Sequence, residues 1–121
     1  MPEYGSVPER VGEVSPDLFS ALDLRVGTVV EVEDFPEARK PAYRLRIDFG
    51  ALGIMNSSAQ LTERYSADDL FGRQVVAVVN IGERRIAGFT SECLVLGVDD
   101  KDGRVVCLKP DAPVANGRRV Y

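Results

Sequence analysis

Apolar and polar residues alternate along much of the chain, and this alternation predicts a protein built mainly of β-strands. Residues 24–35 (LRVGTVVEVEDF) and 42–50 (AYRLRIDFG) both follow a period of two, the second more cleanly. Residues 75–80 (VVAVVN) are almost all apolar, which is typical of a central strand covered on both faces. Shorter strands are expected at 54–58, 91–98 and 104–109.

The alternation also assigns side chains to the two faces of each strand. In the first strand, one face is expected to carry Val26, Thr28, Val30 and Val32. Gly27 interrupts this strand and is a candidate for a β-bulge. In the second strand, the inward-facing residues are expected to be Tyr43, Leu45, Ile47 and Phe49.

Two short helices and a terminal arm complete the expected elements. Ser15 followed by Pro16 is typical of a helix start, as N-cap and first helical residue. Ser66 with Asp69 three residues on is similar to a capping box. Residues 1–16 contain three prolines and no regular period, so we expect an extended or disordered arm.

Three strands, a small helix and two further strands make up the order of an OB-fold, a partly open five-stranded Greek-key barrel. We therefore predict an all-β OB-fold with short helices and an extra C-terminal β-strand. It is divided into an N-terminal arm (1–16) and one OB-fold domain (17–121). In this fold, ligands bind the face of the second and third strands and the loops that join strands 1–2 and 4–5.

Composition places the chain among ordinary soluble proteins. Its 121 residues fit one domain, 45% of them are hydrophobic, and the sequence has no apolar run long enough for a membrane span and no signal peptide. We therefore expect a cytoplasmic protein that does not insert into a membrane. Cys93 and Cys107 lie in apolar segments without metal-binding spacing, so buried, reduced thiols are expected. The chain has no histidine, which excludes Ser-His, Cys-His and histidine-based metal chemistry.

Charge is distributed unevenly along the chain. The net charge is −4, yet residues 1–38 contain nine acids against two bases, and residues 39–121 contain ten acids against thirteen bases. The first segment therefore has a charge of −7 and the second a charge of +3. Because local basic patches decide whether a polyanion docks, the whole-chain charge does not exclude a nucleic-acid partner.

Basic residues occur at the positions where this fold binds ligands. Arg39 and Lys40 fall in the expected loop between the first and second strands, and Arg84 and Arg85 in the expected loop between the fourth and fifth. Arg44 and Arg46 lie on the outward face of the second strand. A solvated surface is the alternative for the loop pairs, and for Arg44 and Arg46 the alternative is the polar face of an edge strand.

Other polar and aromatic side chains near this face allow two interpretations. Ser57, Ser58 and Gln60 either cap a loop or bind a ligand, Asn80 is compatible with a local turn role, and Glu92 with pairing to an arginine. Phe89 follows Gly88 in the expected loop, where an exposed ring would stack on a base or hold an apolar peptide side chain. The candidate ligand-binding residues are Arg39, Lys40, Tyr43, Arg44, Arg46, Ser57, Ser58, Asn80, Arg84, Arg85, Phe89, Ser91 and Glu92.

Three segments resemble the CsaA family, bacterial and archaeal relatives of the tRNA-binding domain found in small tRNA-binding proteins and in methionyl- and phenylalanyl-tRNA synthetases. These segments are residues 22–50, 57–81 and 91–98, and they occur in the family's order and spacing. The resemblance covers about residues 18–121. It implies an OB-fold homodimer whose chain termini contribute to the interface, with no catalytic residues, no metal and no cofactor. The family positions that match are Asn80, Arg84, Ser91 and Glu92, with Arg39, Lys40, Pro41 and Tyr43.

Two functions follow as hypotheses. The first, implied by the resemblance, is a homodimeric chaperone that binds unfolded precursor proteins for export. The alternative is structure-specific binding of tRNA, in which the loop arginines contact phosphates. A third possibility is a structural subunit that docks on a synthetase or on the export machinery. Independently of function, the irregular terminal segments contain apolar residues that burial against a second subunit would explain, namely Tyr4, Val7, Val11, Val14, Val114, Val120 and Tyr121.

Overall fold

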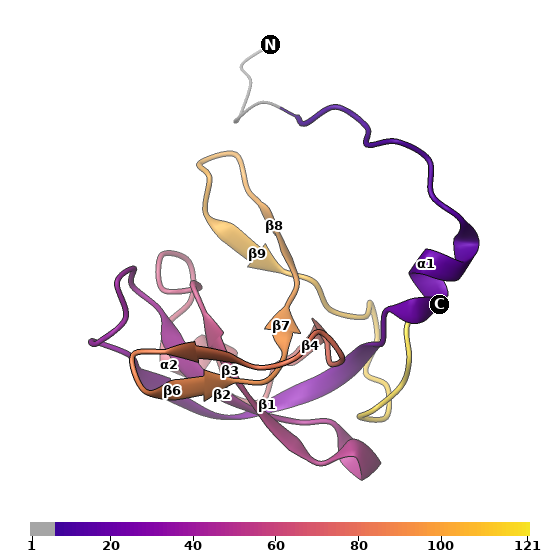
Figure 1. Cartoon of the computed structure of the whole chain (residues 1–121). Helices are drawn as coiled ribbons and strands as arrows, with labels where there is room; N and C mark the ends of the chain where they lie inside the picture. Colours follow the sequence, from indigo (N-terminus) through magenta and orange to yellow (C-terminus); the bar gives the residue numbers. More distant parts are fainter. Residues whose placement is uncertain (1–6) are drawn as a thin grey trace.

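The computed structural model describes residues 7–121 and shows a small antiparallel β-barrel with two short α-helices (Figure 1). The arm residue Tyr4 lies outside the described residues. The strands are β1 (Leu24–Asp34), β2 (Tyr43–Asp48), β3 (Ile54–Ala59), β4 (Gln74–Val78), β5 (Arg84–Ile86), β6 (Phe89–Ser91), β7 (Leu94–Val95), β8 (Gly97–Asp99) and β9 (Val105–Cys107). The helices are α1 (Pro16–Ala21), α2 (Ala67–Leu70) and the 3-10 helix η1 (Gly50–Leu52). Within residues 7–121, no helix is long and apolar enough to cross a membrane.

The main sheet has the strand order β3-β2-β1-β4-β7, with every neighbouring pair antiparallel. The long strand β1 pairs with β4 along its first half and with β2 along its second half, which curls the sheet around one apolar core. The largest fully buried side chains include Phe49, Leu45, Ile47, Leu70 and Val75. This barrel confirms the predicted OB-fold and the central position of the apolar fourth strand.

The irregularity in β1 lies at Val30 and not at Gly27. The register with β2 shifts between Val29 and Glu31, and as a result Val29 is fully buried whereas Val30 is exposed. The prediction that Val32 shares a face with Val26, Thr28 and Val30 is therefore wrong, because the shift brings Val32 to the core side beside Leu45, the side that Val29 also faces. Gly27 is required for another reason, because a Cβ atom there would lie 2.6 Å from the side chain of Ile47.

The region after β4 differs most from the prediction. The expected loop at residues 81–90 contains a β-hairpin, β5–β6, and the single strand expected at 91–98 is divided among β6, β7 and β8. The C-terminal strand β9 pairs with β8 in a separate two-stranded ribbon that extends away from the barrel (Figure 1). Sequence alternation does not reveal these breaks, because the chain changes sheet within a few residues.

Side chains of the segment Ser91–Glu92 close the barrel against β3. The backbone N–H of Asn56 donates to the Glu92 carboxylate at 2.9 Å, and the Glu92 N–H donates to the Asn56 carbonyl at 2.8 Å. The Ser58 N–H donates to Ser91 Oγ at 3.0 Å. Ser91 and Glu92 therefore provide hydrogen-bond partners for the outer edge of β3. Within residues 7–121, Glu92 forms no salt bridge with an arginine, so that interpretation of Glu92 is wrong.

Both predicted helix caps are confirmed. Ser15 caps α1 with Pro16 at the first position, and Ser66 forms a capping box with Asp69. Hydrogen bonds from Ser66 lower the pKa of the Asp69 carboxyl. The arm segment from residue 7 to residue 15 is exposed and forms neither helix nor strand.

Candidate ligand-binding site

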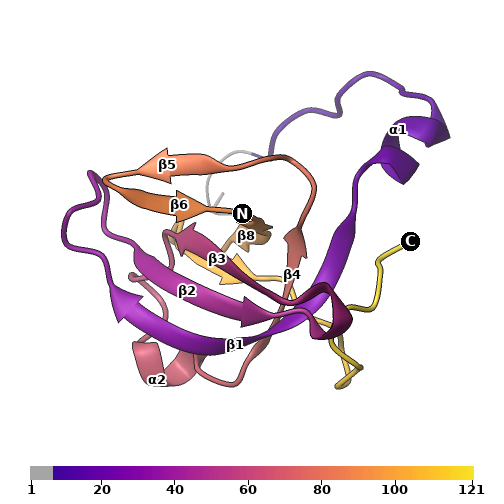
Figure 2. The ribbon, with the colours of Figure 1, turned by 60° about the horizontal axis from the view of Figure 1, so that its bottom comes forward.

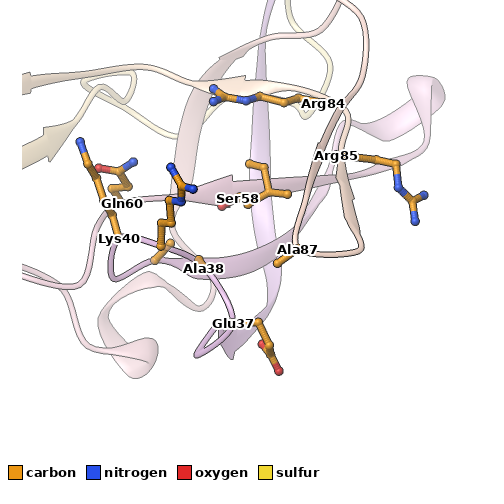
Figure 3. A pocket seen from close by; sticks show the side chains of 11 residues that line it. Glu37, Ala38, Lys40, Ser58, Gln60, Arg84, Arg85 and Ala87 are labelled. Carbon is orange, nitrogen blue, oxygen red and sulfur yellow. The ribbon is translucent and has the colours of Figure 1, made fainter.

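A pocket of about 520 Å³ lies between the β1–β2 loop and the β5–β6 hairpin, and we call it the basic pocket. Figure 2 shows the hairpin lying across one side of the barrel, with its tip close to the β1–β2 loop. The floor is provided by the end of β3 and the residue after it. The lining residues are Glu37, Ala38, Arg39, Lys40, Ala42, Ser58, Gln60, Arg84, Arg85, Ile86 and Ala87 (Figure 3).

Cations from two distant parts of the chain meet in this pocket. Arg39 and Lys40 come from the β1–β2 loop and Arg84 from β5, and all three are exposed. Within residues 7–121, no carboxylate forms a salt bridge with any of the three. Glu37 is the acidic residue of the lining, and its side chain points away from Lys40 and Arg84 (Figure 3). The pocket therefore has a positive charge that an anionic ligand would neutralise.

The adjacent residues Arg84 and Arg85 point in opposite directions, because they lie on a strand and not in an open loop (Figure 3). Arg84 extends across the pocket toward the side that carries Lys40 and Gln60. Arg85 is turned away and donates from Nη1 to Thr90 Oγ1 at 3.2 Å. The two guanidiniums therefore lie in different surroundings, and the prediction that they contact one ligand together does not fit this arrangement.

A tight two-residue turn connects the hairpin strands. Ile86 pairs with Phe89, and between them Ala87 has φ 47° and Gly88 has φ 83°. Two successive positive φ values are typical of the type I′ turn that matches the twist of a hairpin. Ala87 is the sole non-glycine residue with positive φ among the described residues, so the turn contains local backbone strain.

An aromatic cluster joins the two walls of the basic pocket. The rings of Phe35, from the β1–β2 loop, and Phe89, from β6, meet edge to face with centroids 5.5 Å apart. The guanidinium carbon of Arg44 lies 5.3 Å from the Phe35 centroid and 6.0 Å from that of Phe89. We call these three residues the Phe35–Arg44–Phe89 cluster. Phe89 is therefore half-buried in a contact between the walls and is not the exposed ring that the sequence predicted.

Acidic residues of β1 neutralise both outward arginines of β2. Arg44 pairs with Glu33 at 3.1 Å, and Arg46 pairs with Glu31 at 3.7 Å. These pairs follow from the antiparallel register, which places Glu33 beside Arg44 and Glu31 beside Arg46. The strand β2 lies between β1 and β3, so the interpretation of these arginines as edge-strand residues is wrong.

Several predicted ligand-binding residues have polar groups that form hydrogen bonds within the protein. Ser57 is fully buried and donates to the Cys93 carbonyl at 3.1 Å, and the Tyr43 hydroxyl donates to the Tyr65 carbonyl at 2.8 Å. The exposed Asn80 side chain accepts from the Asp23 N–H and donates to the Ala21 carbonyl, each at 2.8 Å, which ties the segment between α1 and β1 to the residues that follow β4. The polar groups of these residues, like those of Ser91 and Glu92, are already hydrogen-bonded to protein groups. Each of these bonds joins segments that are distant in sequence.

Sequence reasoning missed the apolar part of the pocket. Its lining includes four side chains that carry methyl groups and no charge, namely Ala38, Ala42, Ile86 and Ala87. The only sequence signal for these residues is that they lie close to the basic residues in the chain. Alanines occur throughout the sequence, so this signal does not single them out. Ser58 and Gln60, for which the sequence allowed either loop capping or ligand binding, both line the pocket.

The two cysteines are buried free thiols, as predicted. Burial raises the pKa of Cys93 to about 11 and also raises the pKa of Cys107, so both remain protonated at neutral pH. Within residues 7–121, no cluster of three or more histidine, cysteine or acidic side chains is arranged to hold a metal ion.

Comparison with known proteins places this geometry in a family context. Residues 24–119 match the family described as a putative tRNA binding domain. A methionine–tRNA ligase from Porphyromonas gingivalis is 39% identical over 102 residues. That alignment covers 84% of this chain and 15% of the ligase, so the chain spans about a seventh of the length of that relative.

Two solved structures cover nearly the whole chain. The chaperone CsaA from Bacillus anthracis is 51% identical, covers 91% of this chain and is itself covered completely, with a TM-score of 0.86. The CsaA chaperone protein from Picrophilus torridus is 45% identical, covers 90% of this chain and is also covered completely, with a TM-score of 0.84. This chain is therefore similar in both sequence and fold to proteins described as chaperones.

Proposed function

The chain belongs to the putative tRNA-binding domain family, and from this premise we propose that it is a cytoplasmic, homodimeric, non-catalytic chaperone of the CsaA type that binds unfolded precursor proteins for export. The observation that carries the proposal is the basic pocket itself. Its lining contains four cations that form no salt bridge among the described residues, and three of them, Arg39, Lys40 and Arg84, lie around the pocket while Arg85 is turned away. The lining also contains the methyl groups of four apolar residues. An unfolded segment with acidic and apolar side chains would satisfy both kinds of surface.

Exposed apolar residues near both chain ends support a homodimer. Leu18, Phe19 and Leu22 of α1 and its C-cap are 56%, 47% and 41% exposed, and Tyr121 is fully exposed. Arg119 joins the tail to α1 by donating from Nη2 to the Ser20 carbonyl at 2.7 Å. Burial of such exposed apolar side chains against a second copy of the chain would stabilise a dimer. Light scattering of the purified chain is expected to give twice the mass of 13.2 kDa, and a strictly monomeric mass would contradict the dimer.

The chaperone proposal is tested by suppression of client aggregation. Wild-type protein is expected to keep a chemically denatured precursor soluble on dilution and to bind an unfolded acidic-apolar peptide with micromolar affinity. The triple variant Arg39→Ala/Lys40→Ala/Arg84→Ala should lose most of this activity. Arg46→Ala removes a cation that is already paired with Glu31 and is the matched control. A wild-type protein that neither protects the client nor binds the peptide would contradict the proposal.

Binding of tRNA is the second candidate, and the clustering of unpaired cations favours it. Arg39, Lys40 and Arg84 lie together in the basic pocket, and the family match and the ligase relative point to the same ligand class. Neutralising about three phosphates would make log K fall against log salt with a slope of roughly −2 to −3. A flat salt response, or equal affinity for tRNA and for random single strands, would contradict this candidate. Competition between labelled tRNA and an unfolded precursor decides whether both use the basic pocket.

A further inference from the structure

The outer edge of β5 borders the basic pocket and has no strand beside it. Among the described residues, β5 pairs with β6 alone, in a sheet of two strands. The residues from Glu83 to Arg85 are exposed, as is Ala87 at the turn. Unpaired strand edges present a row of N–H and C=O groups to which another chain can add.

The hairpin register identifies which backbone groups face this edge. Ile86 and Phe89 flank the two-residue turn, and in such hairpins the flanking pair exchanges both backbone hydrogen bonds. Antiparallel pairs alternate between bonded and non-bonded, so the Arg85–Thr90 pair is non-bonded. The N–H and C=O of Arg85 therefore point away from β6, toward the outer edge.

We propose that the outer edge of β5 takes an extended client peptide as an additional strand, bonded through the Arg85 main chain; this inference rests on the proposed chaperone function. A bound strand places its side chains alternately on the two faces of the ribbon, and one of those faces belongs to the pocket. On that face, a client residue beside Arg84 lies next to a guanidinium without an acidic partner among the described residues. A client residue beside Ile86 lies next to an apolar side chain of the same pocket.

The charge of the edge selects the occupant. Strand edges that carry arginine or lysine repel basic strands, including the same edge of another copy of the chain. They accept strands with acidic side chains. The preferred client segment is thus extended, with an acidic residue and an apolar residue two positions apart. Main-chain bonding makes the remaining positions tolerant of sequence, and such tolerance is what binding of many unfolded chains requires.

Backbone methylation of a peptide tests this mode of binding. The probe is an eight-residue peptide with glutamate and valine two positions apart, prepared unmodified and with a single N-methyl group moved along successive amides. Because only alternate amides face β5, we expect affinity to fall about tenfold or more at every second position and less than threefold at the positions between. Arg46→Ala, which removes a cation that is already paired with Glu31, should leave affinity within twofold, whereas Arg84→Ala should weaken it about fivefold or more.

Amide hydrogen exchange of the full chain provides a second measurement. Peptide binding is expected to protect the Arg85 amide strongly and to change the Arg84 and Ile86 amides little, since those already bond to β6. If N-methylation at every position has the same small effect while Arg84→Ala still weakens binding, the added strand is wrong and the chaperone proposal stands. If the unmodified peptide does not bind the wild-type protein and precursors are not protected, the chaperone proposal fails, and the inference fails with it.

Discussion

The outward arginines of β2 and the cations of the basic pocket have the same chemistry but different surroundings. Arg44 and Arg46 face glutamates of β1 across an antiparallel register, whereas Arg39 and Arg84 lie on two walls that contribute no pairing carboxylate among the described residues. A basic residue on the expected ligand face is therefore not enough to predict a ligand contact. What distinguishes the two groups is whether the neighbouring strand supplies the counter-charge.

Removing the pocket cations should have the largest effect. In Arg39→Ala/Lys40→Ala/Arg84→Ala, each lost charged contact costs about 1 kcal/mol or more, so binding of an acidic peptide or of tRNA should weaken by roughly a hundredfold. The free energy of unfolding should change by no more than about 0.5 kcal/mol per exposed substitution. Fluorescence titration and urea unfolding measure the two quantities. A large loss of stability with unchanged affinity would show that these residues are structural.

Removing the glutamates of β1 should make the β2 arginines as available to a ligand as the cations of the basic pocket. In Glu31→Gln/Glu33→Gln, Arg44 and Arg46 lose their partners and become available to a polyanion. Affinity for tRNA should rise severalfold, and the slope of log K against log salt should steepen by about 1 to 2. Because both pairs are exposed, stability should fall by about 1 kcal/mol or less. An unchanged slope would mean that these arginines lie outside the ligand path.

The two β2 arginines should differ in their effect on stability. Arg44→Ala removes an ion pair and the contacts with two rings, and it should cost about 1 to 2 kcal/mol. Arg46→Ala removes only the Glu31 pair and should cost about 0.5 kcal/mol or less. Urea unfolding of both variants checks the stability difference. Faster amide exchange in β5–β6 for Arg44→Ala alone would confirm that the Phe35–Arg44–Phe89 cluster fastens the hairpin, and equal exchange in both variants would contradict it.

The smallest effect is expected at the hairpin turn, where no charge is altered. Ala87→Asn replaces a residue strained at positive φ with one that adopts this conformation more readily, and it should stabilise the hairpin by about 0.5 kcal/mol. Affinity for the acidic peptide should rise slightly, because the wall that carries Arg84 becomes more rigid. Thermal unfolding and peptide titration measure both effects, and a loss of stability would contradict the assignment of strain.

Local signals predicted much of this molecule. Alternation in residues 43–49 identified the buried face of β2. Serine followed directly by proline identified the cap of α1, and serine with an aspartate three residues later identified the cap of α2. The hairpin β5–β6 was not predicted, because its three-residue strands are too short for a period to be read. The roles of Ser57, Asn80 and Glu92 were not predicted either, since each bonds to a segment far away in the sequence.

The sequence by itself determined the first four barrel strands, the two capped helices and their order, because side-chain period and capping act over a few neighbouring residues. Tertiary structure alone decided which cations remain available. The register of β1 and β2 placed Glu33 beside Arg44, and the position of the β5–β6 hairpin placed Arg84 in the same pocket as Arg39. Electrostatic neutralisation depends on distance in space, and distance in space between remote residues is set only when the strands pair.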